Sequence, residues 1–414
     1  MSGLEGFDGA LAAARPRAVG ALLRYFRDLD AAEEAFQNAC LRALSTWPRT
    51  GPPRDPAAWL ILVGRNSGID AARRRARETP LPPDEVLSDL GDVETPLAER
   101  LDDADYRDDI LRLLFVCCHP QLPATQQIAL ALRIVGGLSV AQIARAFLVS
   151  EAAMEQRITR AKARIAQADT PFETPGPAER AERVGAVAAM IYLIFNEGYS
   201  ASGAAAPLRA TLCGEAIRLG RLLLRLFQAE PEIMGLVALL LLQHARAAAR
   251  LAPDGEIILL DDQDRSLWDQ GMIAEGRALI EKAARHGRLG AYQIQAAIAA
   301  AHAQARSPEA TDWTRIDQLY RLLEQVQPSP VITLNRAVAV AKRGDLEGAL
   351  ALIEPLEGRL GGYFHFFGVK GWLLMELGRP APAREAFNRA IALAGAAAEA
   401  AQIRRHLDRL AGHA

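Results

Sequence analysis

The stretch LPATQQIALALRIVGGLSVAQIARAFLVSEAAMEQRITRAKARI, residues 122–165, decides the fold of the central part of this chain. Its first half is an apolar run that predicts a helix, opened at Pro123 and closed by the glycine pair 136–137. Ser139 then stands at the position of an N-cap, which predicts a second helix over about 140–147. A short turn is therefore expected between two helices.

A third, basic helix follows this pair after a two-residue turn. Leu148 and Val149 make the turn, and Ser150 caps the helix. A short helix, a tight turn and a basic helix together indicate a helix-turn-helix, which places its second helix in the major groove of DNA. The alternative is an ordinary helical hairpin with a solvated basic end, because helix ends often carry Arg and Lys.

One face of the third helix carries side chains suited to DNA contact. Gln156 can read adenine, and Arg157 and Arg160 can each read guanine through paired hydrogen bonds. Lys162 is better suited to phosphates, which position a protein on DNA without specifying sequence. The predicted DNA-contact set of this helix is Ser150, Ala153, Gln156, Arg157, Arg160 and Lys162.

Two further amphipathic segments lie upstream. In PAAWLILVGRNSGIDAARRRAR (56–77), the apolar residues recur at helical spacing and predict a buried face. The opposite face is basic, since residues 65–77 hold five Arg against one Asp. Before it, DAAEEAFQNACLRAL (30–44) predicts a helix with acidic residues in its first turn.

These three segments, in this order, resemble the bacterial sigma factors of the sigma-70 superfamily, in their small extracytoplasmic-function branch. Segment 31–44 is similar to the helix that binds the polymerase clamp, 59–75 to the promoter-melting and −10 helix, and 122–165 to the −35 helix-turn-helix. The resemblance covers about the first 165 residues. Three positions depart from the family pattern, where an acid, an aromatic and an alanine are usual: Asn38, Cys40 and Gly64.

The resemblance implies two contact sets outside the −35 helix. The partner of the first is core RNA polymerase, through the clamp of its largest subunit, and the set is Glu34, Gln37, Asn38, Leu41 and Arg42. The second set would bind −10 promoter DNA, with arginines on phosphates and polar side chains near flipped bases. Its members are Arg65, Asn66, Asp70, Arg73 and Arg74. Arg65 could instead cap or pair within the fold.

The segment 81–109 is strongly acidic. It holds eleven Asp and Glu against two Arg, a local charge of −9, and its prolines favour an extended first half. It is either a solvated tether or, as the resemblance implies, a strand that runs along the polymerase's RNA-exit path. The second half, from about 97 to 117, predicts the first helix of the −35 domain.

Composition agrees with a cytoplasmic protein. The net charge is −2, so DNA affinity must come from local patches. The four cysteines show no CxxC spacing, and the N-terminus lacks the apolar core of a signal peptide. The run LVALLLLQHA (236–245) is too short for a membrane span and predicts a buried helix. We expect reduced thiols, no membrane contact, no cofactor and no metal; the Cys117-Cys118-His119 triplet is better explained by buried thiols than by a metal site.

An internal repeat of 34 residues marks the C-terminal part. Gly344 matches Gly378, Ala349 matches Ala383, and Ile353 matches Phe387 at this offset. A period of 34 with small residues at such places is typical of tetratricopeptide repeats (TPR), whose concave face usually binds a protein or peptide partner. A helix over about 398–410 would cap the stack.

The segment between the hinge at 170–180 and these repeats is harder to interpret. Its polar residues either line a site or, as we favour, cap helices and form ion pairs; they are Asn196, Glu197, Asp261, Asp262, Asp264 and Arg265. A catalytic site among the acids at 261–264 is the enzyme alternative, but no phosphate loop, zinc spacing or nucleophile motif supports it. The resemblance implies that this extension regulates the sigma factor.

The sequence thus predicts an all-α, non-enzymatic protein that directs promoter-specific initiation. Two small helical domains, the second with the helix-turn-helix, are joined by an acidic linker and followed by TPR-like repeats. The expected divisions are 1–80 (region 2), 81–104 (linker), 105–170 (region 4), 171–290 (extension) and 291–414 (repeats). The alternative is a TPR-type adaptor with a DNA-binding N-terminal half that does not initiate transcription.

Overall fold

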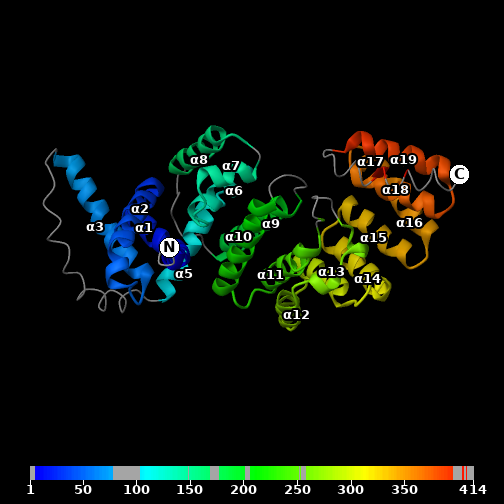
Figure 1. Cartoon of the computed structure of the whole chain (residues 1–414), viewed down its shortest axis with the longest axis horizontal. Coiled ribbons are helices and arrows are strands. Elements are labelled where there is room, and N and C mark those ends of the chain that lie inside the picture. The colour runs from blue at the N-terminus through cyan, green and yellow to red at the C-terminus, as the bar shows by residue number, and fades with distance from the viewer. Residues whose placement is uncertain are drawn as a thin grey trace. The chain divides into compact units, whose positions relative to one another are not determined.

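The computed structural model describes residues 5–77, 103–147, 149–167, 177–200, 206–250, 252, 258–394, 403–404 and 407. Every regular element within these residues is helical, as Figure 1 shows, which confirms the all-α prediction. The chain divides into two compact units, residues 1–198 and 199–414. The acidic linker and the 398–410 helix fall almost entirely outside the described residues.

The first three helices form a small bundle that holds both upstream segments. They are α1 (Glu5–Phe26), α2 (Leu29–Thr50) and α3 (Pro56–Arg77). Asp28 caps α2 by accepting a hydrogen bond from the Ala31 amide at 2.7 Å. Gly64 lets α3 approach closely, because a Cβ there would lie 3.0 Å from the carbonyl oxygen of Ala35. Glycine at this departure from the family pattern therefore fits tight packing of α3 on its neighbours.

Helix α1 was not predicted from the sequence, and α2 is longer than the sequence pattern indicated. The predicted helix 30–44 corresponds to a 22-residue α2 that continues to Thr50 in spite of Pro48. The buried Trp47 explains the extension, because its ring packs edge-on against Trp59 of α3 with centroids 5.5 Å apart. Tertiary packing thus overrides a local helix-breaking signal.

The helix-turn-helix prediction is confirmed nearly residue for residue. The domain that contains it has four helices in its described residues: α5 (Asp103–Cys117), α6 (Ala124–Ile134), α7 (Val140–Ala146) and α8 (Glu151–Ala166). The helix-turn-helix itself is formed by α7 and α8. Ser139 and Gln142 cap α7 reciprocally, each side chain bonding the other residue's amide at 3.1 and 2.8 Å. Ser150 caps α8 by accepting from the Ala153 amide at 3.2 Å. Helix α9 (Pro177–Ser200) continues to the end of the first unit.

The second unit is a series of helical hairpins. Its α-helices are α10 (Ala206–Leu226), α11 (Pro231–His244), α12 (Gln270–Ala284), α13 (Ala291–Gln304), α14 (Trp313–Val326), α15 (Pro330–Lys342), α16 (Leu346–Ile353), α17 (Glu357–Leu360), α18 (Phe364–Glu376) and α19 (Pro380–Leu393). The helical stretch 231–249 is apolar and long enough to cross a membrane by composition alone. Its side chains are mostly buried within the unit, so α11 is the core helix that the sequence predicted.

The 34-residue offset has a physical counterpart in α15–α16 and α18–α19. Gly344 and Gly378 both adopt positive φ (96° and 68°) in the turns between paired helices. Ala349 and Ala383 are fully buried, and Ile353 aligns with Phe387 in the same core. These two hairpins therefore repeat one packing arrangement.

Two of the acids of the extension, Asp261 and Asp264, form the kind of cap and ion pair that we favoured. Asp264 accepts a hydrogen bond from the Ser266 amide at 2.9 Å, and Asp261 pairs with Lys342 at 2.7 Å. Arg265 donates to the carbonyl oxygen of His302 at the C-terminal end of α13. These contacts stabilise loops rather than assemble a group of acids around a substrate.

Candidate polymerase and promoter interface

Helix α8 has one buried and one exposed face. Met154, Ile158, Ala161 and Ile165 are buried and anchor it to the domain core. The predicted DNA face is on the other side: Ala153, Gln156 and Arg160 are exposed, and Arg157 is half-buried. The helix therefore presents a polar, basic surface of the kind that enters a major groove.

Lys162 is engaged elsewhere in this structure. Its Nζ lies 2.6 Å from Asp30 and 2.9 Å from Glu33, both on α2. Burial lowers the pKa of Lys162, but hydrogen bonds to these two carboxylates and their charges more than compensate and raise it above its ordinary value. The predicted phosphate contact of Lys162 stays a prediction, and it requires these ion pairs to break.

Helix α2 presents the predicted polymerase-binding set as a continuous stripe. Glu34, Gln37 and Asn38 are exposed, and Arg42 is half-buried. Leu41 belongs to the same stripe and is 66% exposed, although it is aliphatic. The opposite side of α2, by contrast, is packed in the bundle core. A helix with one packed face and one exposed, partly apolar face is suited to binding a partner.

Helix α3 carries the predicted −10 set. Arg65 and Asn66 are half-buried, and the Arg65 guanidinium lies 6.0 Å from the ring centre of Tyr25. The helix continues through Asp70, Arg73 and Arg74, but their side chains lie outside the described part of the structure. The backbone of α3 thus places the whole set on one helix.

Three family models match this chain. "Sigma-70 region 2" matches residues 11–78, and "Sigma-70, region 4" matches residues 112–165. The chain belongs to the sigma-70 family. A family of unknown function, DUF6596, matches residues 183–284. An uncharacterized protein of Rhizobium meliloti (strain 1021) is 70% identical over 404 residues, which cover 98% of this chain and 96% of that protein.

Membership in this family gives the two matched regions a role in promoter recognition. Sigma-70 proteins are transcription initiation factors rather than enzymes, and they bind core RNA polymerase and promoter DNA. Region 2 corresponds to α1–α3, and region 4 to the C-terminal end of α5 together with α6–α8.

Tyr25 is a candidate contact of this sigma factor that the sequence pattern did not single out. It is 52% exposed at the end of α1 and packs edge-on against Phe26, with ring centroids 5.0 Å apart. An exposed aromatic ring beside Arg65 offers a stacking surface for an unpaired base. Only the fold brings it to α3, because the two residues are forty positions apart in the chain.

The Cys117-Cys118-His119 triplet is buried. Both thiols are buried; burial raises the pKa of Cys118 to about 12 and that of Cys117 well above its ordinary value. The His119 ring nitrogen Nδ1 accepts a hydrogen bond from the Gln121 amide at 3.3 Å. Among the described residues no group of three or more His, Cys, Asp or Glu is placed to hold a metal ion.

Proposed function

We propose that this protein is a sigma factor of the extracytoplasmic-function branch that directs core RNA polymerase to promoters with a −35 and a −10 element. The α2 stripe would bind the clamp of the largest subunit, α3 the melted −10 strand, and α8 the −35 major groove. The protein would act in the cytoplasm, where the polymerase is. The observation that carries this proposal is the simultaneous exposure of the α2 stripe and the α8 face on two correctly ordered domains.

The α8 assignment is tested by removing the two base-reading arginines. The variant Arg157→Ala with Arg160→Ala should weaken −35 binding by about 1–3 kcal/mol for each base contact. Glu155→Ala is the matched control, because Glu155 is exposed on the same helix and is not in the predicted contact set. Equal promoter affinities of the double variant and the control, measured within the polymerase holoenzyme, would refute the groove assignment.

The α2 assignment is tested at its exposed leucine. Leu41→Glu should abolish or strongly reduce capture of core polymerase, because it introduces a charge at the centre of the proposed contact. Leu322→Glu on α14 is the control, since Leu322 is also an exposed helical leucine (40%) but lies in the second unit. Undiminished capture by Leu41→Glu would place the polymerase contact elsewhere.

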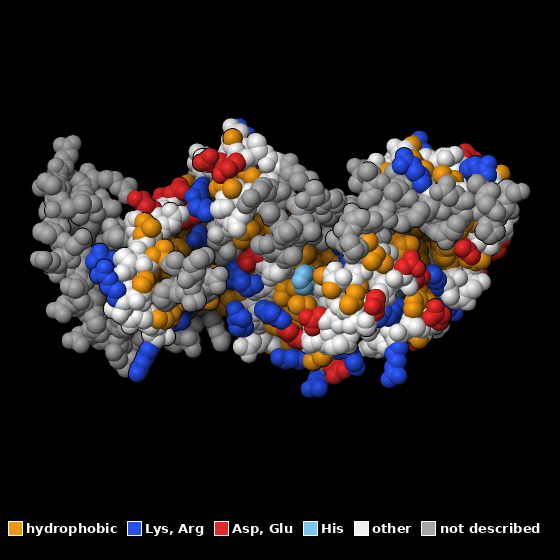
Figure 2. All heavy atoms as spheres, viewed as in Figure 1, with side chains coloured by type: hydrophobic (Ala, Val, Ile, Leu, Met, Phe, Trp, Pro, Cys, Tyr) orange, Lys and Arg blue, Asp and Glu red, His pale blue; other side chains and the backbone are white. Residues whose placement is uncertain are grey.

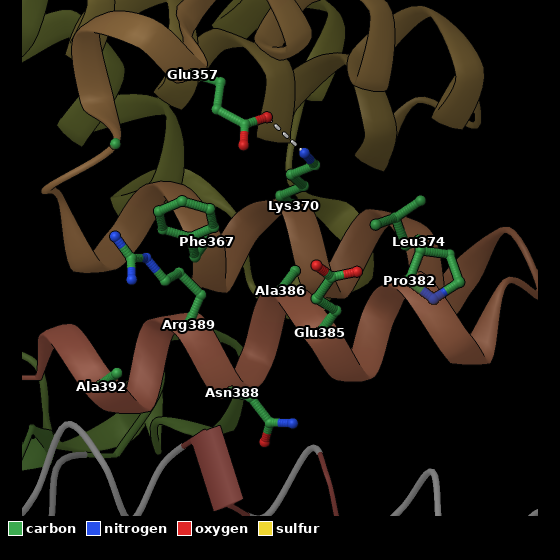
Figure 3. A pocket seen from close by; sticks show the side chains of 11 residues that line it. Glu357, Phe367, Lys370, Leu374, Pro382, Glu385, Ala386, Asn388, Arg389 and Ala392 are labelled. Carbon is green, nitrogen blue, oxygen red and sulfur yellow. Dashed lines mark hydrogen bonds and ion pairs between the residues drawn. The ribbon is translucent and has the colours of Figure 1, made fainter.

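The second unit is proposed to regulate this activity as a tetratricopeptide-type repeat domain. Its α17, α18 and α19 line a pocket of about 610 Å³. Figure 3 shows the side chains of Phe367 and Arg389 next to each other, with the guanidinium 5.9 Å from the ring centre, and Lys370 pointing to Glu357, 2.7 Å away. On the face seen in Figure 2, acidic and basic side chains are interspersed over the described part of this unit. A mixed lining of this kind suits a peptide with charges of both signs better than a nucleic acid.

The regulatory role predicts separable effects. Charge reversal in the pocket by Lys370→Glu with Arg389→Glu should change transcript yield. It should leave core polymerase capture unchanged, because these residues belong to the second compact unit and the α2 stripe belongs to the first. Glu376→Lys, a charge reversal on α18 outside the pocket lining, is the control. If transcript yield from the pocket variant equals that of wild type and control, this pocket plays no part in regulation.

A further inference from the structure

Two arginines that follow α11 bond only to neutral groups among the residues that the structure describes. Arg246 donates to the hydroxyl of Tyr199 at 2.6 Å and to the side-chain oxygen of Gln243 at 2.5 Å. Arg250 donates to the carbonyl oxygen of Tyr199, and its guanidinium lies 3.6 Å from the centre of that ring. Both arginines are half-buried. Buried positive charge is normally paired with an acid, so this region of the second unit holds charge that these contacts do not balance.

Arg265 adds a third guanidinium, and one edge of it is unpaired. Its Nη1 donates to the carbonyl oxygens of His302 at 2.9 Å and Ala305 at 2.6 Å, which fixes the side chain at the end of α13. Nε and Nη2 are buried and have no hydrogen-bond partner in the described part of the chain. These two N–H groups form the guanidinium edge that holds both oxygens of a carboxylate or phosphate. Arg221 uses the same two atoms on Glu275, at 3.0 and 2.5 Å, so Arg265 presents a preformed oxyanion-binding edge.

Two neutral side chains of the same region also carry buried polar atoms that lack a partner among the described residues. They are Nε1 of Trp268, which is 3% exposed, and Oγ1 of Thr311, which is 6% exposed. The guanidinium of Arg265 lies 4.9 Å from the ring centre of Trp268. Thr311 directly follows η5 (Pro308–Ala310), which packs against η3 (Leu260–Asp262), the turn that precedes Arg265. A buried donor without an acceptor lowers stability, so these atoms indicate an acceptor from outside the chain.

The charges around this edge favour an anion over a water molecule. Burial, together with the positive charges of Arg246 and Arg265, lowers the pKa of the His302 ring to about 4. Burial also lowers the pKa of Arg265 itself; the charges of Asp261 and Glu309 raise it, but not enough to offset the desolvation. Both of these acids are exposed to solvent. The buried edge therefore lies in a positive environment, where a negative charge is stabilised.

We propose that Arg265, with Arg246 nearby, binds the carboxylate or phosphate group of a small ligand in the second unit. The flanking residues Asp264, Ser266 and Leu267 are exposed, so the edge lies just beneath the surface of one short loop. An oxyanion of a few atoms fits such a position, whereas a folded partner or a nucleic acid duplex does not reach a buried guanidinium edge. None of these residues lines the pocket of α17–α19, and neither the site nor its ligand depends on sigma activity.

The position of the site indicates what its ligand would do. Arg246 and Arg265 belong to the segment of unknown function, residues 183–284, whereas His302 belongs to α13, which follows that segment. An anion on the Arg265 edge would neutralise the positive charge there and hold the loop more firmly against α13. The ligand would therefore stabilise the folded second unit.

Thermal melts of the full chain test the site with two defined probes, inorganic phosphate and acetate, each compared with sodium chloride at equal ionic strength. We expect a saturable rise in melting temperature with at least one probe, half-saturated below about 10 mM, because a ligand that binds only the folded state stabilises it by mass action. A response to phosphate alone assigns a phosphate ligand, a response to acetate alone assigns a carboxylate ligand, and both responses assign the oxyanion class. No saturable response beyond that of chloride to either probe would overturn the proposal.

Matched arginine variants place the response at the proposed edge. Arg265→Lys keeps the positive charge but loses the paired N–H groups, so it should weaken binding of the responding probe by about tenfold or more. Arg306→Lys is the control and should bind as wild type, because Arg306 is exposed on the loop that follows α13. If Arg265→Lys loses helicity, Arg246→Gln replaces it with Arg306→Gln as its control, since the lost charge should weaken binding severalfold. Equal affinities of a folded Arg265 or Arg246 variant and its control would overturn the site, whatever the protein does in transcription.

Discussion

The junction in the first unit and the repeat hairpins in the second unit are held together by opposite physical means. At this junction, where α2 meets α6 and α8, Glu33 forms ion pairs with Arg133 at 3.0 Å and with Lys162 at 2.9 Å, residues that lie at least a hundred positions further along the chain. In the hairpins, Ala383 and Phe387 pack in an apolar core built from neighbouring helices. Water and competing charges can replace an ionic contact, whereas an apolar core is lost only with the fold.

The difference indicates which contacts can break while the surrounding helices stay folded. The ionic junction can be disrupted without unfolding either bundle, because water can replace the partners of its charges. The contacts of the hairpins are local and belong to the fold of the second unit itself. The predictions below test this contrast, starting with the largest effect.

The largest loss of stability is expected from the hairpin core. Phe387→Ala should lower the free energy of unfolding of the second unit by about 3–5 kcal/mol, because it empties a fully buried site against Gly371. Urea denaturation followed by circular dichroism measures it. Leu322→Ala, at an exposed site, should cost well under half as much; equal losses would contradict the proposed core.

Acid should weaken the second unit through His302. Burial, with the charges of Arg246 and Arg265, lowers the pKa of this ring to about 4 from 6.5. Between these two pH values the unfolded chain binds a proton that the folded chain does not, so stability falls as the pH falls, by about 3 kcal/mol at most. His302→Phe should flatten this dependence in thermal melts, and the exposed His286→Phe should leave it intact. Parallel pH profiles for both variants would argue against a neutral His302.

Helix caps should contribute equally in the two units. Ser150 and Asp345 each accept a hydrogen bond from the amide three residues later, at 3.2 and 2.9 Å. Replacing either by alanine should cost about 1 kcal/mol in urea denaturation. A much larger loss for Ser150→Ala would mean that the junction depends on the exact position of α8.

The smallest effect is expected from the exposed member of the junction. Asp30→Asn should reduce stability by less than about 1 kcal/mol, because an exposed ion pair contributes little. A loss of several kcal/mol would show that the junction is part of the fold rather than a separable contact.

The sequence predicted best those features that depend on neighbouring residues. Ser139 and Ser150 indicated the helix-turn-helix because a cap acts within three positions. The ion pairs of Glu33 with Arg133 and Lys162 were not predictable, since nothing local relates these residues, and Lys162 looked like any basic residue at a helix end. Trp47 likewise extended α2 through a contact with α3. Burial of charge at a junction is a tertiary property, and one sequence carries no direct signal for it.

The central claim, sigma activity, is tested most directly by run-off transcription on sheared genomic DNA of the organism that encodes the chain. Core RNA polymerase would be supplied with the wild-type protein or with the variant Arg157→Ala with Arg160→Ala. The account predicts discrete transcripts from the wild-type protein that share −35 and −10 sequences, with a lower yield from the variant. No transcripts from the wild-type protein above those of core polymerase alone, while a primary sigma factor is active in the same preparation, would contradict it.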